Sequence, residues 1–460
     1  MNVDKYLKAQ KHIESYRIQN GNTIFYSTYE KKEDDKNNNS KFWGKLFDLS
    51  YQKIEEFEDS TKSTEVWKSS FDGANIAKEQ MNEWVNDTVS RIKNLIGDNC
   101  NVLEIGCGNG IIFNSIIEEV EKYTGTDVAE KGLNIIRNSN KGKSSVEKID
   151  LYQLDALEID QLPDHKYDLI IVNSVAQYFP SLDYVFKVFK KLEKFTSSKC
   201  HIFLGDIRSL ELQKLFYFEV VKTKHPEISS AEILDRIGRM QSRENETFYS
   251  TEFFKLFPSF FDYINSTSIQ LKKGTFNNEL NLYRYDVTLS CEEKKEAPFV
   301  ISLDWEDLKN PEVDIEKRVK ELNQNDMLEV NNIPNNRFLS IKDEFLSLIE
   351  LEEGTGKNKK YATVDSTIPI VSILNNIAES EQIFVQMDFM ENDFLNLKAQ
   401  FIKHPSNNSQ KPCYKREFKQ LSNRWEEKKS SSDKQFEEKL AVQFPGFEIH
   451  KVSNNLLLNP

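Results

Sequence analysis

The sequence has few cysteines, and they lie far apart. Its 460 residues include only five, and no two form a C-x-x-C pair: Cys100, Cys107, Cys200, Cys291 and Cys413. An odd number of isolated cysteines argues against a disulfide framework and against a zinc site. We therefore expect a reducing, cytoplasmic setting and no bound metal.

Long apolar runs and blocks of basic residues are also missing. No hydrophobic stretch reaches the length of a membrane-spanning helix, and the first residues lack the apolar core of a signal peptide. The net charge is −13, with 74 acidic against 61 basic side chains. Because such a charge repels nucleic acids and anionic lipids, we expect neither a nucleic-acid nor a membrane partner.

What the chain does contain is enough apolar material to fold. Hydrophobic residues make up 38%, and 460 residues are enough for two domains and an accessory region. We expect residues 1–95 to be largely helical and to form an N-terminal helical or lid segment. The clearest helix is at 77–95, where apolar residues recur three and four positions apart: Met81, Trp84, Val85, Val89 and Ile92.

Strand and helix patterns alternate from Cys100 onward. A short apolar run at 101–105 ends in glycines, an amphipathic stretch follows, and the alternation continues to residue 206. The run 168–172 is apolar nearly throughout, as strands buried on both faces are. This order predicts an α/β fold over 96–295, with a Rossmann-like parallel sheet covered by helices on both faces.

Two strand-like runs follow a mostly helical region at 207–260. Residues 263–273 and 281–290 are separated by the linker 274–279. This arrangement predicts an antiparallel hairpin that closes the edge of the sheet.

Residues 296–460 are less regular. They contain strand-like pieces at 299–305 and 381–389 and a charged stretch at 423–439. We expect this part of the chain to form a smaller α+β lobe.

A glycine-rich loop follows the first strand of the alternating region. Residues 104–110 read E-I-G-C-G-N-G and lead into a helix. Glycines let the backbone approach a ligand closely, and a helix start offers N–H groups and a positive dipole end. We expect a nucleoside with a charged tail to bind here, with Cys107 as a small filler rather than a nucleophile. The loop residues of this site are Gly106, Cys107, Gly108, Asn109 and Gly110.

Two acids beside the loop narrow the choice of ligand. Glu104 ends the strand just before the first glycine, where a carboxylate would hold the ammonium of a methionine moiety. Asp127, followed by Val128, ends the next strand, where a carboxylate accepts both ribose hydroxyls. The pair favours S-adenosylmethionine over a nicotinamide dinucleotide, which would prefer a longer G-x-G-x-x-G loop without a preceding acid.

The ends of two later strands complete the predicted cofactor site. Asp155 and Ala156 follow the third strand, and Asp155 either accepts a hydrogen bond from the adenine amino group or belongs to a surface turn. Asn173 and Ser174 end the fourth strand, where we expect the sulfonium end of the cofactor.

Several segments are more specific than the glycine loop. VLEIGCGNGIIF, YTGTDVAEKGLNIIR, NSVAQYFPSLDYV, GDIRSL and NELNLYRYDVTL stand in this order in the chain. They resemble the N-methyltransferase domains that are embedded in nonribosomal peptide synthetases, and the resemblance covers residues 65–290. It implies a class I methyltransferase fold, S-adenosylmethionine as cofactor and methyl transfer to an α-amine.

The same resemblance extends weakly to the last part of the chain. In that family the methyltransferase domain interrupts an adenylation domain. Residues 331–340 (NNIPNNRFLS) are similar to a segment that follows the methyltransferase, and residues 436–460 are similar to the approach to the adenylation domain's end. The lobe at 296–460 therefore resembles an adenylation-domain remnant. Because we find no Ser/Thr/Gly-rich ATP loop, we expect no amino-acid activation by this chain.

Polar side chains after the later strands are the candidates for chemistry. Gln177 and Tyr178 follow the fourth strand, Asp206 and Arg208 follow the fifth, and Glu279 lies in the hairpin linker. The resemblance and the strand order together favour Tyr178 and Glu279 as groups that orient the amine, with Glu279 as proton acceptor. Arg208 would hold a substrate carboxylate or carbonyl, or fix Glu279 by a salt bridge.

Each candidate has an alternative reading. Tyr178 could be a core aromatic, Glu279 an exposed turn acid, and Asp206 the N-cap of the helix that follows. Arg284 and Asp286 are interpreted as a cross-strand or surface pair.

Three functions remain open at this point. The first is N-methylation of the α-amine of an amino acid or of an aminoacyl or peptidyl intermediate, possibly on a carrier protein or synthetase. The second is methylation of a free amine or oxygen in a small molecule. The third is a non-catalytic scaffold that keeps the cofactor site. Docking of an acidic carrier would need a basic patch, for which the candidates are Lys187, Lys190, Lys191 and Lys194.

Overall fold

The computed structural model describes most of the chain between residues 38 and 403. The described ranges are 13–19, 23–28, 38–52, 63–64, 67–292, 299–324, 326–353, 368–390, 393–403 and 448–451. The charged stretch 423–439 lies outside them, as does most of the segment 436–460.

Parallel strands form the centre of the predicted Rossmann-like sheet. The central strands β3 and β6 are rich in apolar residues because helices cover both faces of the sheet. Their order in space is β5-β4-β3-β6-β7, and every neighbouring pair is parallel. The chain order therefore reverses between β3 and β6, where ligands of such sheets bind. The bounds are β3 Asn101–Ile105, β4 Lys122–Asp127, β5 Ile149–Gln153, β6 Tyr167–Asn173 and β7 Thr196–Arg208.

The predicted hairpin is present at the edge of this parallel set. β8 (Ser266–Leu271) pairs antiparallel with β9 (Arg284–Ser290), and β9 pairs antiparallel with β7. The residues between the two strands include the short helix α11 (Glu279–Leu282). The hairpin thus brings residue 279 beside the end of β7, but it does not close the edge of the sheet as predicted, because β8 pairs onward with β12.

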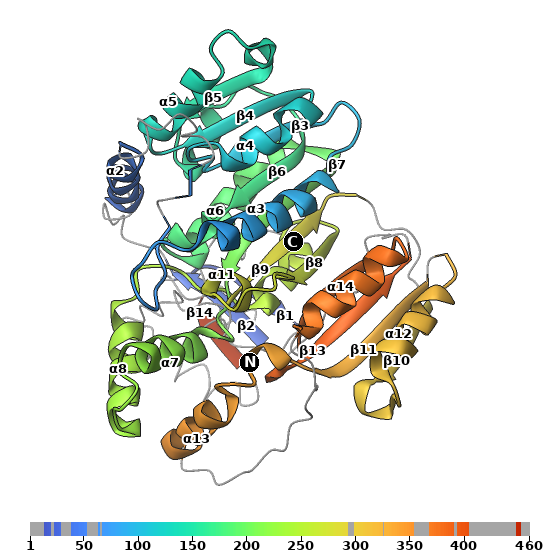
Figure 1. The fold of residues 1–460 in the computed structure, drawn as a ribbon. Helices are drawn as coiled ribbons and strands as arrows, with labels where there is room; N and C mark the ends of the chain where they lie inside the picture. Colours follow the sequence, from blue (N-terminus) through green and yellow to red (C-terminus); the bar gives the residue numbers. More distant parts are fainter. Residues whose placement is uncertain are drawn as a thin grey trace.

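Helices connect and cover the strands (Figure 1). They are α3 Lys78–Lys93, α4 Ile111–Ile116, α5 Glu130–Ser139, α6 Leu182–Leu192, α7 Gln213–Lys224, α8 Ser230–Arg243, α9 Thr251–Lys255 and α10 Phe257–Phe260. Short 3-10 turns occur at Ile117–Glu119, Ser144–Lys148, Ala156–Gln161, Ala176–Tyr178 and Glu193–Phe195. The predicted α/β fold and the predicted helix at 77–95 are both found.

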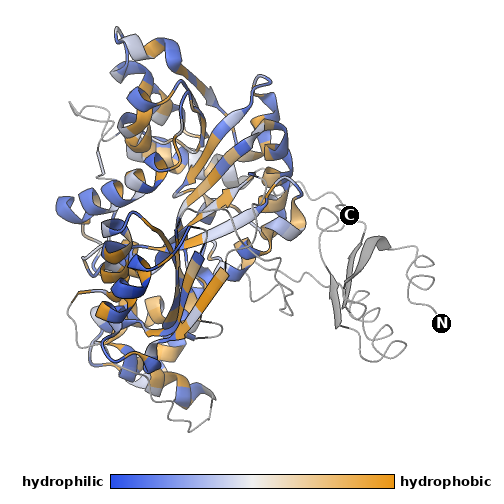
Figure 2. Ribbon diagram, turned by 90° about the vertical axis from the view of Figure 1, so that its right-hand side faces the viewer, coloured by the Kyte–Doolittle hydropathy of each residue, from blue (hydrophilic) through white to orange (hydrophobic). Residues whose placement is uncertain are grey.

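An aromatic cluster packs α6 against α9 and α10. The ring centroids of its contacting pairs lie 4.8–6.2 Å apart. The five rings are those of Phe186, Phe189, Phe253, Phe257 and Phe261. All five side chains are buried, and Figure 2 shows how hydrophobic residues follow the strands and the inner sides of the helices. This cluster anchors the helices that follow β7.

The C-terminal lobe continues the same sheet. β12 lies parallel to β8, with Met387 opposite Gln270, and the order onward is β12-β13-β11-β10. In Figure 1 the lobe lies beside the hairpin. Its elements are β10 Phe299–Asp304, α12 Pro311–Lys320, β11 Asp326–Pro334, α13 Lys342–Glu353, α14 Ile370–Ser380, β12 Phe384–Met390 and β13 Asp393–Ile402, with 3-10 turns at Trp305–Asp307 and Asn336–Phe338. The two predicted strand-like pieces are therefore strands β10 and β12.

The N-terminal region differs from its expected helical character. It does contain the helix α2 (Asn38–Gln52), but β1 (Ile13–Gln19) and β2 (Thr23–Thr28) are strands. They form a separate three-stranded sheet with β14 (Glu448–Lys451). Segments such as T-I-F-Y-S-T are rich in β-branched and aromatic residues, which favour strands over helix.

Candidate active site

The glycine loop makes a tight turn at the carboxyl end of β3. Gly106 and Gly110 have φ angles of +75° and +91°, in the left-handed region that favours glycine. A Cβ atom at Gly106 would lie only 2.3 Å from a methyl group of Val175. The amides of Gly106 and Cys107 donate to the carbonyl of Thr126 at 2.7 and 3.0 Å, which fixes the loop against β4.

Glu104 is a buried acid at the floor of the loop. Its side chain is 2% exposed and accepts a hydrogen bond from the Tyr123 hydroxyl at 2.5 Å. Burial raises the pKa of Glu104 to about 8. The hydrogen bond from Tyr123 acts in the opposite direction and lowers this pKa, whereas the charge of the nearby Asp127 raises it further. A carboxylate in this position gains most from a cationic group brought by a ligand.

Asp127 binds the loop and the start of the next helix. Its two carboxylate oxygens accept from the Gly108 amide at 2.8 Å and from the Ala129 amide at 2.7 Å. Burial raises the pKa of Asp127 to about 6, against the lowering effect of these hydrogen bonds. Burial also raises the pKa of the Cys107 thiol well above its usual value, which is consistent with its interpretation as a filler.

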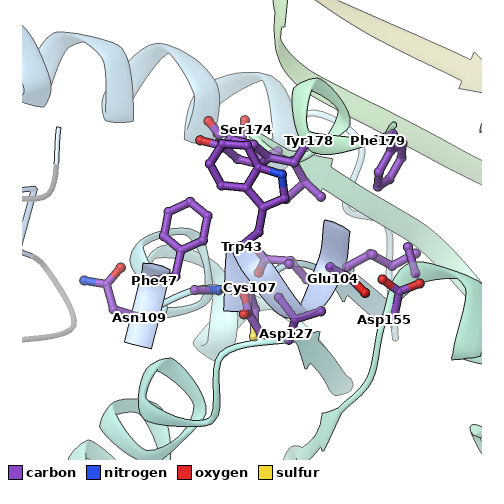
Figure 3. A pocket seen from close by; sticks show the side chains of 18 of the residues that line it. Trp43, Phe47, Glu104, Cys107, Asn109, Asp127, Asp155, Ser174, Tyr178 and Phe179 are labelled. Carbon is purple, nitrogen blue, oxygen red and sulfur yellow. Dashed lines mark hydrogen bonds between the residues drawn. The ribbon is translucent and has the colours of Figure 1, made fainter. Parts of the chain in front are cut away.

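Helix α2 covers the loop with aromatic side chains. Trp43, Phe47 and Tyr51 recur every fourth residue, and so they lie on one face of the helix. The Trp43 and Tyr178 ring centroids are 4.4 Å apart, and Figure 3 shows Trp43, Phe47 and Tyr178 around the same space. The backbone carbonyl of Val128 would be 3.1 Å from a Cβ atom at Gly44, so the glycine lets α2 approach β4 closely. These residues were not among the predicted site residues, although their four-residue spacing was a usable signal.

Together these elements enclose a cleft of about 1100 Å³, including the part open to solvent. All twelve predicted cofactor residues except Gly110 line it: Glu104, Gly106, Cys107, Gly108, Asn109, Asp127, Val128, Asp155, Ala156, Asn173 and Ser174. Gly110 instead caps the start of α4. Asp155 accepts from the Tyr184 hydroxyl at 2.6 Å and from the Leu157 amide at 2.8 Å, and so it holds the start of a 3-10 turn at the rim of the cleft.

The cleft residues fit S-adenosylmethionine. A buried carboxyl at Glu104 matches an ammonium group, and Asp127 offers a carboxylate one strand away, at the usual place for ribose. The apolar and aromatic walls from α2 match an adenine ring and the methylene groups beside the sulfonium. The described residues contain no group of three or more potential metal ligands, and no described helix is long and apolar enough to cross a membrane.

A second cavity of about 730 Å³ adjoins the cleft. Trp67 and Tyr178 line both spaces. The second cavity also contains the predicted catalytic residues Gln177, Arg208 and Glu279. Tyr178 therefore stands at the junction of the two spaces, and burial raises the pKa of its hydroxyl well above the usual value.

Glu279 is held firmly in this second cavity. It begins the short helix α11 and is largely buried, with 7% exposure. Its carboxylate accepts from the Ser70 amide at 2.7 Å and from the Ser70 hydroxyl at 3.1 Å. The guanidinium of Arg284 lies 3.9 Å away. These contacts exclude the alternative of an exposed turn acid.

Asp206 contacts side chains that line the cofactor cleft and the second cavity. It is fully buried and has a φ angle of +65° at a break in the pairing of β7 with β9. Its carboxylate accepts from Trp84 Nε1 at 3.0 Å and from the Ser174 hydroxyl at 2.8 Å, and it forms an ion pair with Arg284. Such backbone strain persists only where the surroundings fix it. Asp206 is therefore no helix N-cap, and it reaches the cavity through Arg284.

The two arginines near the site have different partners from those expected. Arg208 pairs with Glu246 at 2.7 Å and with Glu244 at 3.3 Å, and lies 3.8 Å from the centre of the Phe248 ring. It does not pair with Glu279; Arg284 takes that place because β9 runs beside β7.

Asp286 does not pair with Arg284 either. It binds Lys272 at 2.7 Å and Arg91 at 3.0 Å in a buried network. The proposed cross-strand or surface pair of Arg284 and Asp286 is therefore corrected. The candidate lysine patch on α6 is also partly neutralised, since Lys187, Lys191 and Lys194 each lie near an aspartate.

Comparison with known proteins bears on this site. Residues 96–232 match a family model described as a methyltransferase domain. The chain carries a methyltransferase domain. Its fold is the predicted class I type, and its cofactor is S-adenosylmethionine, which the cleft fits.

Similar sequences occur within much larger proteins. The chain is 31% identical over 265 residues to chondramide synthase cmdD of Chondromyces crocatus, and the match covers 57% of this chain and 7% of the synthase. It is also 31% identical over 301 residues to the nonribosomal peptide synthetase asqK of Emericella nidulans, covering 63% of this chain and 12% of that protein. The resemblance to nonribosomal peptide synthetases is confirmed, and the chain spans only a small part of these relatives.

Similar solved structures are more distant. The N-methyltransferase NodS from Bradyrhizobium japonicum is 15% identical, with a TM-score of 0.31, and the match covers 46% of this chain and 98% of that chain. A similarity at this level gives no indication of the substrate.

Proposed function

We propose that this chain is an S-adenosylmethionine-dependent N-methyltransferase that acts on the α-amine of an amino acid or of an aminoacyl or peptidyl intermediate. The observation that carries the proposal is the position of Glu279. Its carboxylate lines a cavity that shares Trp67 and Tyr178 with the cofactor cleft. An acceptor in that cavity would therefore lie between a carboxylate and the cofactor.

The cofactor would be held by the groups of the first cleft. When bound, S-adenosylmethionine supplies an electrophilic methyl group on its sulfur. Glu104 would bind the ammonium of its methionine part, Asp127 the ribose, and Asp155 the adenine. The aromatic face of α2 would exclude water from the reacting end.

The acceptor amine needs to be neutral and correctly oriented. An α-amine has an ordinary pKa of about 7.7–8.0, so only modest help is needed to remove its proton. Glu279 would accept that proton, because Ser70 holds its carboxylate at the wall of the cavity in which the amine would lie. The raised pKa of Tyr178 keeps its hydroxyl protonated, so this group orients the amine by hydrogen bonding and does not act as the base.

Asp206 and Gln177 would act through these groups. Asp206 positions Arg284, and its hydrogen bond with Ser174 joins the acceptor side to the cofactor cleft. Gln177 is buried beside Tyr178 in the same cavity. We assign both as positioning residues.

A role in natural-product biosynthesis is the context that the relatives support. The names of the two relatives described above are chondramide synthase and nonribosomal peptide synthetase, and a carrier-bound acceptor would suit a chain similar to part of such proteins. We therefore propose a carrier protein or a synthetase as the partner that presents the acceptor to this chain.

A free small molecule is the second candidate acceptor. The second cavity is open to solvent and contains several charged groups, so a small amine or alcohol could enter it without a carrier. A non-catalytic scaffold is disfavoured because such a protein would not need Glu279 fixed by Ser70 beside the cofactor cleft.

Product analysis tests the proposal. The protein is incubated with S-adenosylmethionine and a panel of free amino acids, their N-acetylcysteamine thioesters and simple alcohols, and the products are analysed by mass spectrometry. We expect N-methylated amino-acid products and S-adenosylhomocysteine, with a loss of at least tenfold in turnover for Glu279→Gln. Glu119→Gln, on the surface and paired with Lys93, is the matched control. Methylation of alcohols alone would refute the assignment.

A further inference from the structure

The loop between β8 and α11 leads directly to Glu279, the first residue of α11. Helix α3 holds this loop from one side. The Glu83 carboxylate accepts from the amides of Thr275 at 2.9 Å and Phe276 at 3.3 Å, and from the side-chain amide of Asn281 at 2.7 Å. These contacts fix the middle of the segment between β8 and α11, and α11 itself. All of these contacts are made by residues of the region 65–290, which resembles the N-methyltransferase domains.

The C-terminal lobe holds the same loop from the other side. The Ser372 hydroxyl, in α14, donates to the backbone carbonyl of Lys273 at 2.7 Å. The Lys273 ammonium in turn pairs with Glu379 of the same helix at 2.6 Å. The loop is therefore clamped between α3 and α14.

The segment NNIPNNRFLS, at 331–340, forms the centre of this junction. Asn335 is fixed to β13, since its backbone amide donates to the carbonyl of Leu395 and its side chain donates to that of Phe394, both at 2.9 Å. Asn336 accepts from the amide of Ile370 at 2.8 Å, at the start of α14. Two consecutive side chains thus tie the segment to the lobe.

The next residue, Arg337, leaves the lobe and reaches α11. Its Nε donates to Asn335 Oδ1 at 2.9 Å, and its Nη1 donates to the carbonyl of Asn281 at 3.4 Å, within the helix that Glu279 begins. The ring of Phe338 packs on that of Tyr283 at 5.5 Å. The segment therefore meets the end of α11 with two adjacent side chains.

Arg337 is costly to bury in this position. It is 8% exposed, and burial lowers its pKa to about 10. Among the described residues no carboxylate pairs with it, and its Nη2 has no hydrogen-bond partner. A neutral side chain would avoid this desolvation cost. What the guanidinium contributes is a bridge from β13, through Asn335, to α11.

We propose that the C-terminal lobe is a working part of the acceptor site, in which Arg337 and Ser372 position Glu279 by holding α11 and the loop before it. This inference rests on the role proposed for Glu279. It assigns to residues 331–340 and to α14 a function in the methyltransferase itself. The lobe is then more than a remnant of an adenylation domain.

Hydrogen–deuterium exchange of the full chain tests the clamp without any substrate. Arg337→Gln and Ser372→Ala remove one contact each, and Arg318→Gln and Ser347→Ala make the same changes at exposed positions of the lobe. We expect exchange in peptides covering 272–283 to become at least tenfold faster in the first two variants and to stay unchanged in the controls. Unchanged exchange in both test variants would overturn the inference. Ser372→Ala removes a single hydroxyl, so it carries the test if Arg337→Gln does not fold.

A double-mutant cycle tests whether the clamp acts through Glu279. Release of S-adenosylhomocysteine is measured with the aminoacyl N-acetylcysteamine thioester that the wild-type chain methylates fastest. We expect Arg337→Gln to lower kcat about tenfold in the wild-type background and to have no further effect in the Glu279→Gln background. The Kd of S-adenosylhomocysteine should stay unchanged throughout. Equal losses in both backgrounds would refute the inference alone, whereas full turnover by Glu279→Gln would refute the proposed function.

Discussion

Glu104 gives the sharpest prediction about the cofactor cleft, because its charge is disfavoured in the free protein. Its folded-state pKa is about 8, against an ordinary value of 4.5. A raised carboxyl pKa means that stability is fully present below the ordinary pKa and is lost as the pH rises through about 8. At 1.36 kcal/mol per pKa unit, the full loss is about 5 kcal/mol. The ammonium of a bound cofactor should restore much of this lost stability, because it pairs with the ionised carboxylate.

The pH dependence of binding follows from the same shift. Only the ionised carboxylate pairs well with the ammonium, and its population falls roughly twentyfold between pH 7.5 and pH 6.0 for a pKa of about 8. We expect the Kd of S-adenosylhomocysteine to rise about twentyfold over that interval, measured by isothermal titration calorimetry. Asp127, with a pKa of about 6, should add a smaller step at the lower end.

Glu104→Gln separates the two effects. At pH 8 the variant without ligand should be more stable than wild type by a few kcal/mol in chemical denaturation, since it no longer buries an ionised group. It should also bind S-adenosylhomocysteine weakly and keep only the small pH step near 6. Glu119→Gln is the surface control. A wild-type Kd that is equal at pH 6.0 and 7.5, or a variant that binds as tightly as wild type, would refute this reasoning.

Three further substitutions test other parts of the structure. Asp127→Ala should weaken S-adenosylhomocysteine binding at least tenfold in calorimetry, because it removes the carboxylate that holds Gly108 and that we propose to bind the ribose; unchanged binding would contradict this. Trp43→Ala should raise the KM for S-adenosylmethionine severalfold by opening the contact with Tyr178, and an unchanged KM would show that α2 does not cover the cofactor. Phe257→Ala should lower the free energy of unfolding by about 3–5 kcal/mol in urea denaturation, whereas a loss below 1 kcal/mol would mean that the aromatic cluster repacks.

The parallel central sheet was predictable from the sequence because short strand-like runs, such as the apolar run 168–172, alternate with helical stretches. The order of its strands in space was not predicted. The hairpin of β8 and β9 was predictable because two strand-like runs stand on either side of the short linker 274–279. The strands β1 and β2 were not predicted, because runs of only six or seven residues carry little periodicity, although their β-branched and aromatic residues were a usable signal. The pairing of β2 with β14 also joins segments more than four hundred residues apart, which no local pattern indicates.

That the predicted cofactor residues would line one cleft was foreseeable, because the carboxyl ends of parallel strands meet at one edge of a sheet. This rule placed Glu104 and Asp127 in one cleft from their positions alone. The rule could not assign the partners of Arg284, because these depend on β9 lying beside β7. The suggested salt bridge of Glu279 with Arg208 was therefore wrong, and the arginine near Glu279 is Arg284. The role of Arg337 was equally hidden, because its partner is a backbone carbonyl on a different lobe.

The central claim is that an α-amine receives the methyl group beside Glu279. The most direct measurement supplies S-adenosylmethionine with a ¹³C-labelled methyl group and follows aminoacyl N-acetylcysteamine thioesters by mass spectrometry and NMR. The account predicts a labelled N-methyl group in the product and a loss of at least tenfold in its rate of formation for Glu279→Gln. A label found only on oxygen, or formed at the wild-type rate by the variant, would contradict it.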